Sequence, residues 1–464
     1  MHQIENIFAT FANYAWGPWL MVLLVGGGFF FLFYSGLAPF RYFYHAIDVL
    51  RGKYNDPDNP GEINPFQALS SAMAGAVGLG NISGVAIAIY TGGPGAIFWM
   101  WVCAIAGMAT EFFVNSLAVI YRGKDSQGKL QGGPMYVLVE GLGRKWKPFA
   151  VVFSVAALIG CLPAFQANQL VQVLRDLVFI PNGWIGESHF IFNFLSGVII
   201  AGLVSLVIFG GISRIGAVAA RIVPTMVLLY LITALSTLAI FHRHIPGMFA
   251  LIFNDAFSGK AVAGGVIWAV IVTGIRRGAF SNEAGVGTTA MAHGAAKTAE
   301  PIRQGLVAML GPFIDTILVC TCTALMILVT GVWEAGEVNG VTLTAMAFRE
   351  AFAGVGIYIL LTCVLFFSVS TMFSYSYYGS KALGFLIGAE RKHYYNYFYV
   401  LMIVVASVAS LRTVINVIDG MYALMAVPTM VSALILAPKV KQAAKIYFAK
   451  LEVEERTPLK IKDS

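Results

Sequence analysis

Long apolar runs separated by short polar loops organise this chain. Runs of about 20 apolar residues match the length that a helix needs to cross a bilayer, whereas the strands of a membrane barrel alternate over about ten. The pattern predicts an all-α membrane protein with about eleven transmembrane helices, at residues 17–38, 65–90, 95–121, 148–171, 190–212, 216–240, 262–291, 304–331, 352–386, 395–411 and 416–437. We therefore expect residues 1–464 to form a single membrane domain.

Two of the predicted helices are interrupted at their centres by glycine and polar residues, at 74–84 and at 278–287. Glycine makes a helix easier to unwind, and each backbone group that unwinding frees is costly in hydrocarbon unless something binds it. A matched pair of such interruptions is typical of the binding site of a membrane transporter.

Close helix packing is the alternative explanation for these glycines, because small residues let transmembrane helices approach one another. Packing alone would not require polar side chains in the middle of a membrane. The two interruptions nevertheless hold four of them, namely Asn81, Ser281, Asn282 and Glu283. We therefore favour a binding site over a packing motif.

The predicted helices divide into two sets of five once the first span is set aside. Each set opens with an interrupted helix, and because five is odd the second set must cross the membrane in the opposite sense. This predicts a five-plus-five inverted repeat with two broken helices. The expected parts are an extra N-terminal span and loop (1–64), a first repeat (65–240), a second repeat (262–437) and a basic cytoplasmic tail (438–464).

Composition and charge support a membrane protein. Apolar residues make up 58% of the chain and charged residues only 11%, with a mean hydropathy of +0.77, whereas soluble domains carry about 25% charged residues. The net charge of +7 could indicate a nucleic-acid partner. Its distribution argues against one, because 23 Lys and Arg residues fall in alternate loops and the tail and only five in the other loops.

That asymmetry predicts an orientation. Cytoplasmic loops carry the excess of Lys and Arg, so we expect the N-terminus outside, the C-terminus in the cytoplasm and the basic tail near anionic lipid. The N-terminus lacks a basic region before its apolar run, so we do not expect a cleaved signal peptide. No obligatory protein partner is evident.

Unwound helices offer two kinds of binding pole. Half-helix N-termini attract carboxylates, and exposed carbonyl ends attract cations, so one site can hold a zwitterion together with an inorganic cation. Asn81 can supply a side-chain oxygen, and the small residues around it leave room only for a small substrate.

Polar residues on two further spans are candidates for the same site. Gln166 could recognise substrate, or it could join helices through hydrogen bonds. The hydroxyls of Ser370 and Thr371 suit Na⁺, although they could instead bond carbonyls of their own helix.

Charged residues on the second interrupted helix are candidates for a gate. Arg276, Arg277 and Glu283 are expected to form a gate or an ion pair, because a charge at the bilayer centre costs about 2.5–3.5 kcal/mol or more. Direct proton coupling through Glu283 and arginines that merely mark the end of a span are the alternatives. Glu111 and Asp315 are expected to make interhelical hydrogen bonds.

The sequence contains no motif of an enzyme active site, neither a Gly-x-Ser-x-Gly elbow, nor a Walker loop, nor His-Glu-x-x-His. We expect no catalytic residue, no cofactor and no metal other than Na⁺ as a coupling ion.

Taken together, the motifs resemble the alanine/glycine:cation symporter family over nearly the whole chain. The matching segments are NPFQAL at 64–69, VGLGNISGV at 77–85, GGPGAIFWMW at 92–101, QGGPMY at 131–136 and GIRRGAFSNEAG at 274–285. The resemblance implies a symporter of the prokaryotic plasma membrane that takes up alanine or glycine with Na⁺ or H⁺. It also implies a fold similar to the bacterial leucine transporter.

The expected site follows from the interruptions and this resemblance. The predicted substrate-binding residues are Gly78, Leu79, Gly80, Asn81, Gln166, Phe280, Ser281, Asn282 and Gly285. By similarity, Ala76 and Asn81 serve one cation beside the substrate carboxylate. The carbonyls of Ala74 and Val77, together with Ser370 and Thr371, form a second cation site.

Three positions depart from the family pattern. Leu79 stands where the family has Thr, and CLPAFQANQ at 161–169 replaces a pattern of Gly-Asn-x-x-Gln-Ala-Asn-Ser. Glu111 lies where a basic residue is common. The first two border the expected pocket, so transport of a different small zwitterion is the alternative function, and a channel is a weaker one.

Overall fold

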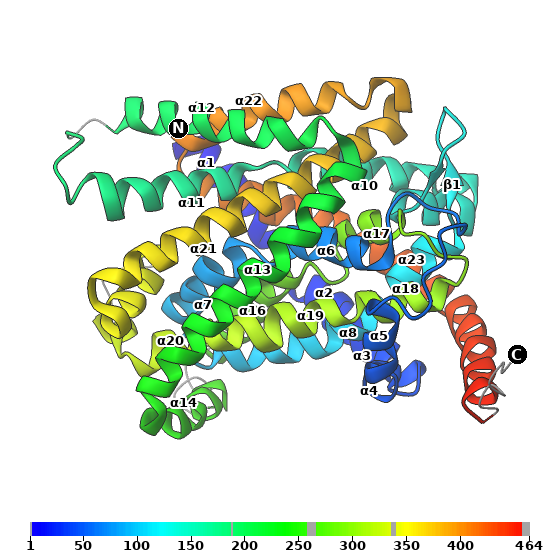
Figure 1. Ribbon diagram of the computed structural model, residues 1–464, viewed down its shortest axis with the longest axis horizontal. Coiled ribbons are helices and arrows are strands. Elements are labelled where there is room, and N and C mark those ends of the chain that lie inside the picture. Colours follow the sequence, from blue (N-terminus) through cyan, green and yellow to red (C-terminus); the bar gives the residue numbers. More distant parts are fainter. Residues whose placement is uncertain (1, 187–188, 258–265, 336–339, 457–464) are drawn as a thin grey trace, which may run out of the picture.

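The computed structural model is a helical bundle that describes residues 2–186, 189–257, 266–335 and 340–456 (Figure 1). One short antiparallel hairpin, formed by β1 (Gly123–Lys124) and β2 (Leu130–Gln131), projects from one end of the bundle. Residues 262–265 of a predicted span and residues 457–464 of the predicted tail lie outside the described part of the chain.

The helices vary from single turns to 48 residues. The first half of the chain holds α1 (His2–Ala15), α2 (Pro18–Met21), α3 (Gly27–Tyr34), α4 (Ala38–Arg41), α5 (Phe43–Leu50), α6 (Pro65–Ala76), α7 (Val85–Gly92), α8 (Ala96–Ile120), α9 (Pro134–Tyr136), α10 (Lys147–Gly160), α11 (Ala164–Leu174), α12 (Phe190–Ile208) and α13 (Gly211–Ile240). The second half holds α14 (Ile245–Phe257), α16 (Val266–Asn282), α17 (Thr288–His293), α18 (Pro301–Ala308), α19 (Leu310–Pro312), α20 (Thr321–Val329), α21 (Gly340–Ile387), α22 (Tyr394–Val408) and α23 (Leu411–Arg456).

Short π-helical and 3₁₀ turns join several of these helices. They are η1 (Val22–Gly26), η2 (Gly80–Gly84), η3 (Val137–Gly141), η4 (Arg144–Trp146), η5 (Arg175–Phe179), η6 (His242–His244), η7 (Phe313–Cys320), η8 (Val332–Ala335) and η9 (Ala389–Arg391).

The described residues contain seven helical segments long and apolar enough to cross a membrane, which confirms a multi-pass helical membrane protein. These segments are Ala96–Ile120, Arg144–Phe179, Phe190–Ile208, Gly211–Ile240, Pro301–Val329, Gly340–Ile387 and Thr413–Val453. Two bent pairs raise the number to nine, Ala9–Ala15 with Pro18–Tyr34 (45°) and Pro65–Ala76 with Gly80–Gly92 (49°).

The two other predicted spans correspond to shorter helices. The helix α16 has 17 residues because an irregular segment ends it, and α22 has 15. Either falls short of the roughly 20 residues that cross a bilayer without help from neighbouring segments. The number eleven and the inverted repeat therefore stay predictions.

Local sequence explains where the first interrupted helix begins. Pro65 stands at the first helical position, where its missing N–H costs nothing. Asn64 and Gln67 form a capping box, in which each side chain accepts from the other's backbone N–H (2.8 and 3.1 Å). This fixed start sets the depth at which α6 ends. The helix then packs against α13, α21 and α17.

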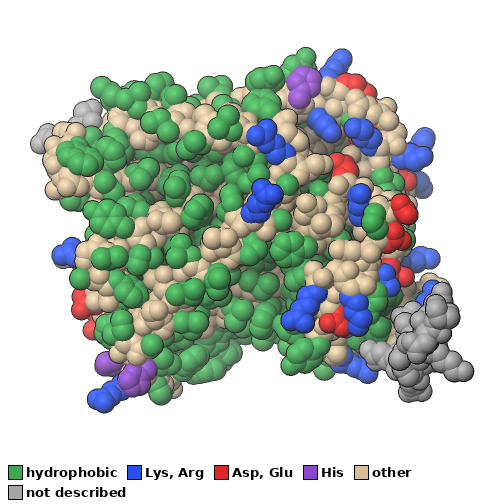
Figure 2. Space-filling model, viewed as in Figure 1, with side chains coloured by type: hydrophobic (Ala, Val, Ile, Leu, Met, Phe, Trp, Pro, Cys, Tyr) green, Lys and Arg blue, Asp and Glu red, His purple; other side chains and the backbone are tan. Residues whose placement is uncertain are grey.

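The surface has the distribution expected of a membrane protein. Large apolar side chains are exposed along its flanks, for example Leu203 and Leu206 of α12 at 50% and 65% exposure. Figure 2 shows apolar side chains over most of the visible face. Lys and Arg gather toward the end that carries β1 and the C-terminus in Figure 1, and we call this the basic end.

Candidate functional site

The first interrupted helix breaks where the glycines predict. The helix α6 ends at Ala76, the backbone of Val77 is extended (φ −72°, ψ 91°), and η2 begins at Gly80. The Asn81 Oδ1 atom accepts a hydrogen bond from the freed Gly78 N–H at 2.9 Å. Asn81 thus replaces one of the helical bonds that the break removes.

The second break is sharper. The helix α16 ends at Asn282, and α17 begins at Thr288. Between them, Glu283 (φ 54°), Gly285 (φ 81°) and Gly287 (φ 97°) adopt left-handed conformations. Glycine takes such a conformation at little cost, whereas a residue with a side chain takes it only when its surroundings impose it.

The position of this break corrects part of the sequence interpretation. The interruption was expected at 278–287, but the backbone stays helical through Asn282. Gly278 faces α8 instead, since a Cβ there would lie 3.1 Å from Cys103 Cβ and 3.3 Å from Met100 Cα. It serves close helix packing, which was the alternative considered for these glycines.

One carboxylate joins the two breaks. The Asn81 Nδ2 atom donates to Asp315 Oδ1 (2.7 Å) and to its carbonyl (3.0 Å), and Ser281 Oγ donates to Asp315 Oδ2 (2.8 Å). The neighbouring Thr316 hydroxyl donates to the same Oδ2 and accepts from Asn282 Nδ2 (3.2 Å). Asp315 is wholly buried in η7. The predicted interhelical hydrogen bond is present, and it lies at the contact between both interrupted helices.

Phe280, one of the predicted substrate-binding residues, contacts the first interrupted helix and two further helices, whereas Gly285 lies against Met430 and Leu24. A Cβ on Gly80 would lie 3.5 Å from the Phe280 ring and 3.4 Å from Ser281 Cα, at ordinary van der Waals distance, so the two interrupted helices pack directly against each other here. The Phe280 ring contacts Phe165 of α11 edge-on (5.4 Å between centroids) and Tyr422 of α23 (5.8 Å). The next residue on α11, Gln166, is buried, and its Oε1 atom has no hydrogen-bond partner among the residues that the structure describes.

The departures from the family pattern lie inside the protein. Leu79 is fully buried within the first break. Cys161 and Pro163 belong to the irregular turn between α10 and α11. This turn determines where α11, the helix that carries Gln166, begins.

The second predicted cation site is partly assembled. A Cβ on Gly78 would lie 2.5 Å from Thr371 Oγ1, so Thr371 lies directly against the first break. The hydroxyls of Ser370 and Thr371 both donate to the Phe367 carbonyl of their own helix (3.1 and 2.9 Å). Bonding to a carbonyl of the same helix was the alternative role considered for Ser370 and Thr371. Each hydroxyl oxygen still has lone pairs with which to accept a hydrogen bond or bind a cation. Ala74 is buried in the last turn of α6.

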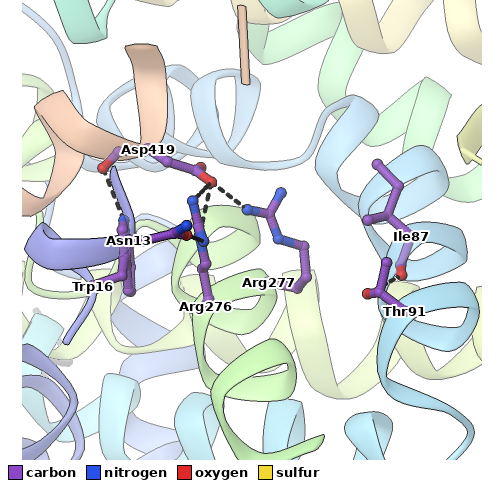
Figure 3. Close-up of polar contacts among 7 residues, drawn as sticks. All are labelled: Asn13, Trp16, Ile87, Thr91, Arg276, Arg277 and Asp419. Carbon is purple, nitrogen blue, oxygen red and sulfur yellow. Dashed lines mark hydrogen bonds and ion pairs between the residues drawn. The ribbon is translucent and has the colours of Figure 1, made fainter. Parts of the chain in front are cut away.

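The arginines of α16 pair with a residue that the sequence interpretation missed. Figure 3 shows Asp419 of α23 between Arg276, Arg277 and Trp16. Its Oδ2 atom lies 2.5 Å from Arg276 Nη2 and 2.6 Å from Arg277 Nη2, while its carbonyl accepts from Trp16 Nε1 (2.8 Å). The signal available in the sequence was an isolated acid near the start of the last predicted span.

Glu283 is not brought to these arginines. Its carboxylate accepts hydrogen bonds from the hydroxyls of Thr288, Tyr375 and Tyr422. The expected grouping of Arg276, Arg277 and Glu283 in one ion pair is therefore absent from this structure. The left-handed turn at Glu283 carries the side chain away from the arginines, which stand about two turns earlier on α16.

Glu111 supports the same break from α8. It accepts from Thr289 Oγ1 (2.6 Å), Asn115 Nδ2 (2.8 Å) and the Gly285 N–H (3.4 Å). Its expected interhelical hydrogen bond is present. The bond to Gly285 satisfies a backbone donor that the break exposes.

Arg122, at the basic end, is a second residue that the sequence interpretation did not assign to the site. Arg122 follows α8 and donates to the carbonyls of Gly294 (2.9 Å), Pro60 (3.2 Å), Thr298 (3.2 Å) and Ala296. Burial lowers the pKa of Arg122 to about 10, which leaves it protonated at neutral pH. One guanidinium thus ties the loop before α6 to the loop after α17, and so links the ends of both interrupted helices.

Comparison with known proteins identifies the family of the chain. Residues 1–461 match the sodium:alanine symporter family. The chain is 38% identical over 450 residues to the sodium/alanine symporter AgcS of Methanococcus maripaludis, which covers 95% of this chain and 97% of AgcS. It is 34% identical over 451 residues to the probable sodium/glutamine symporter GlnT of Bacillus subtilis, which covers 96% of this chain and 91% of GlnT.

A solved structure shares the fold. MhsT in complex with L-phenylalanine superimposes with a TM-score of 0.56 at 12% identity, over 83% of this chain and 99% of MhsT. At that identity the likeness concerns the fold alone, and it confirms the expected fold of the leucine-transporter type. On the whole-length match and its relatives, the chain belongs to the sodium:alanine symporter family.

Proposed function

We propose that the protein is a secondary active symporter that couples inward Na⁺ movement to uptake of a small neutral amino acid, with alanine and glycine as the first candidates. Family membership and the relative AgcS support this assignment. The observation that carries it is the Asp315 carboxylate, which contacts Asn81 on one interrupted helix and Ser281 on the other. A cation bound beside it would couple the two helices directly.

The charge of this cluster favours a cation. In the described part of the chain, hydrogen bonds reach the Asp315 carboxylate only from neutral side chains, those of Asn81, Ser281 and Thr316. A buried carboxylate held only by neutral groups is costly when ionised, and carboxylate and amide oxygens are ligands for hard cations. We propose that Asp315 joins Asn81 and the Ala76 carbonyl around one Na⁺.

The second Na⁺ is proposed to lie on the other side of the first break. Thr371 packs against Gly78 there, and its hydroxyl oxygen remains available as an acceptor. The Ala74 and Val77 carbonyls and Ser370 would complete an oxygen site.

The amino acid is proposed to lie between Phe280 and the first break. The N–H groups at the start of η2, near Leu79 and Gly80, suit its carboxylate, because a helix N-terminus carries partial positive charge. The unpaired Gln166 Oε1 suits its ammonium group. The Phe280 ring, which packs against Gly80 and contacts Phe165 and Tyr422, would line the space for the side chain.

The predicted arrangement in the membrane forms part of the proposal. The inverted repeat of 65–240 and 262–437, the prokaryotic plasma membrane and a cytoplasmic basic end all follow from the sequence pattern. Under that orientation the Asp419 pair would be the outer gate. Arg122 would then close the inner side.

The available driving force is sufficient. One Na⁺ that crosses about 100 mV contributes roughly 2.3 kcal/mol. A tenfold Na⁺ gradient adds about 1.4 kcal/mol. Together they support roughly several-hundredfold accumulation of a neutral substrate for each ion.

The test is uptake of labelled alanine and glycine into proteoliposomes with an inward Na⁺ gradient, then with choline replacing Na⁺. Uphill uptake that requires Na⁺ supports symport, whereas equilibration without accumulation would indicate a channel. Uptake driven by a pH gradient alone would show that H⁺, and not Na⁺, is the coupling ion. Labelled glutamine provides the third substrate, because GlnT is named a probable sodium/glutamine symporter.

A further inference from the structure

A cavity with a mixed polar and apolar lining lies at the basic end, separate from the residues assigned above. Its volume is about 250 Å³. Residues from α21, from the hairpin, from the junction of α12 and α13 at 208–215 and from η9 and the start of α22 at 389–396 line it. It contains charged side chains of both signs, Lys381 and Lys392 together with Glu62 and Asp125.

Lys381 is the residue of this cavity best placed to bind a ligand. It is only 5% exposed, and its ammonium group donates to the Met291 carbonyl (2.9 Å) and to the Tyr377 hydroxyl (3.1 Å). An ammonium group has three donors, so one remains for another acceptor. Within the described residues no carboxylate forms an ion pair with it. A buried cation without a counterion favours an anionic ligand.

The cavity also supplies the opposite charge. Asp125 Oδ2 accepts from Gln131 Nε2 (3.2 Å), and Glu62 stands at the exposed rim just before α6. Ser380 donates to Asn396 Oδ1 (2.7 Å), which adds a neutral polar wall. An inorganic anion would use only the lysines. A free α-amino acid uses both poles, since it carries one carboxylate and one ammonium group.

We infer that this cavity is an exit subsite, in which the transported amino acid binds through its carboxylate to Lys381 and through its ammonium group to Glu62 and Asp125. The inference rests on the proposed function and adds a second substrate site to it. The class of ligand is a small zwitterionic α-amino acid.

The subsite also has a mechanical link to the second interrupted helix. Met291, whose carbonyl Lys381 holds, belongs to α17. The remaining donor of the ammonium group binds the substrate carboxylate while another stays on the Met291 carbonyl, so Lys381 connects substrate in the cavity to α17.

The experiment measures KM separately on the two sides of proteoliposomes with a known orientation. Lys381→Met removes the charge and keeps the side-chain length. We expect the KM for alanine efflux from the basic end to rise about tenfold, the effect of losing one charge-assisted contact, while the KM for uptake from the opposite side stays unchanged. Lys445→Met, at an exposed lysine of α23 outside the cavity, is the matched control and leaves both constants unchanged.

Two further variants separate binding from folding. Lys381→Arg keeps the charge and restores the efflux KM. Glu62→Gln, at an exposed position, raises the efflux KM without removing the lysine and remains informative if Lys381→Met does not fold. Equal changes of both KM values in Lys381→Met would show a purely structural role and overturn the subsite.

The remaining outcomes distinguish the two proposals. Efflux that depends on chloride and ignores Glu62→Gln would assign the cavity to an inorganic anion and overturn the inference. Wild-type transport with an unchanged efflux KM in Lys381→Met would overturn the subsite and leave the symporter intact. Wild-type protein that neither binds nor moves any small amino acid would overturn the proposed function and the subsite together.

Discussion

At the scale of single residues, Asp315 is the most consequential side chain in the structure. Its position within an apolar span identified it as a polar residue that needs a partner. Which partners it has depends on the fold, because Asn81 and Ser281 stand 234 and 34 positions away along the chain. The contact explains why both interruptions carry polar residues at the same depth.

Asp315→Asn tests this role. The amide keeps the shape of the side chain and removes its charge, so we expect the Na⁺ concentration for half-maximal transport to rise about tenfold or more. Na⁺-titrated alanine uptake measures it. Asp176→Asn, a carboxylate paired with Arg175 away from the breaks, is the control. An unchanged Na⁺ dependence in Asp315→Asn would remove Asp315 from the cation site.

Gln166→Ala tests substrate recognition. Because the Oε1 atom has no partner in the described part of the chain, its removal should break no hydrogen bond of the described fold, but it should raise the KM for alanine about tenfold through the lost bond to the ammonium group. Initial uptake rates over a range of alanine concentrations measure the KM. Na⁺ dependence serves as the internal control, and we expect it to stay constant. A parallel shift of both would indicate a general distortion of α11.

At the scale of secondary-structure elements, the ends of the interrupted helices are held in different ways. Two arginines and one buried aspartate connect α16 to α23, and one arginine binds four backbone carbonyls at the basic end. Both clusters join segments that must separate if access alternates. Their chemistry is polar, so water can replace their bonds when either side opens.

Asp419→Asn tests the contact between α16 and α23. Removal of the carboxylate leaves two arginines without their counterion, which costs about 3–5 kcal/mol at a buried site. We expect a lower melting temperature and slower uptake, both measured on purified protein. The pair Asp419→Ala with Arg276→Ala should recover part of the stability. Loss of stability that is simply additive would argue against direct coupling.

Arg122→Ala tests the closure of the basic end. We expect the two loops to separate more often, so that a thiol reagent added at that end alkylates Cys320 faster. Cys320 is a suitable reporter because it contacts Asn81 Nδ2 (3.4 Å) and Ser281 Oγ (3.2 Å). Arg122→Lys should behave almost like alanine, because one ammonium group cannot reproduce the fork of a guanidinium. Labelling at the wild-type rate in both variants would contradict a gate.

At the scale of the whole molecule, the structure is closed around its centre. Asn81, Ser281 and Asp315 are fully buried, and along the chain the arginines that bind Asp419 precede Ser281, whereas the loop that Arg122 binds follows it. An apolar outer surface surrounds this polar interior (Figure 2). Under the proposed symport, such a closed arrangement corresponds to the intermediate between two open states.

The sequence by itself determined the class of the protein and the position of its first break. Apolar runs have few alternatives to membrane helices, because hydrocarbon leaves every backbone group to be satisfied within the chain. Glycine and asparagine at 78–81 predicted the first break directly. The motif at 274–285 indicated the family, which the whole-length match confirmed.

Only the tertiary structure decided which charges meet. Arg276 and Glu283 are close along the chain, but the left-handed turn at Glu283 separates their side chains. Arg276 instead forms an ion pair with Asp419. The tertiary structure also showed that Gly278 serves helix packing, because this role depends on the proximity of Cys103 on α8. Hydropathy records the depth of a residue in the membrane and not its direction around the helix, so partners across the bundle emerge only from the packed fold.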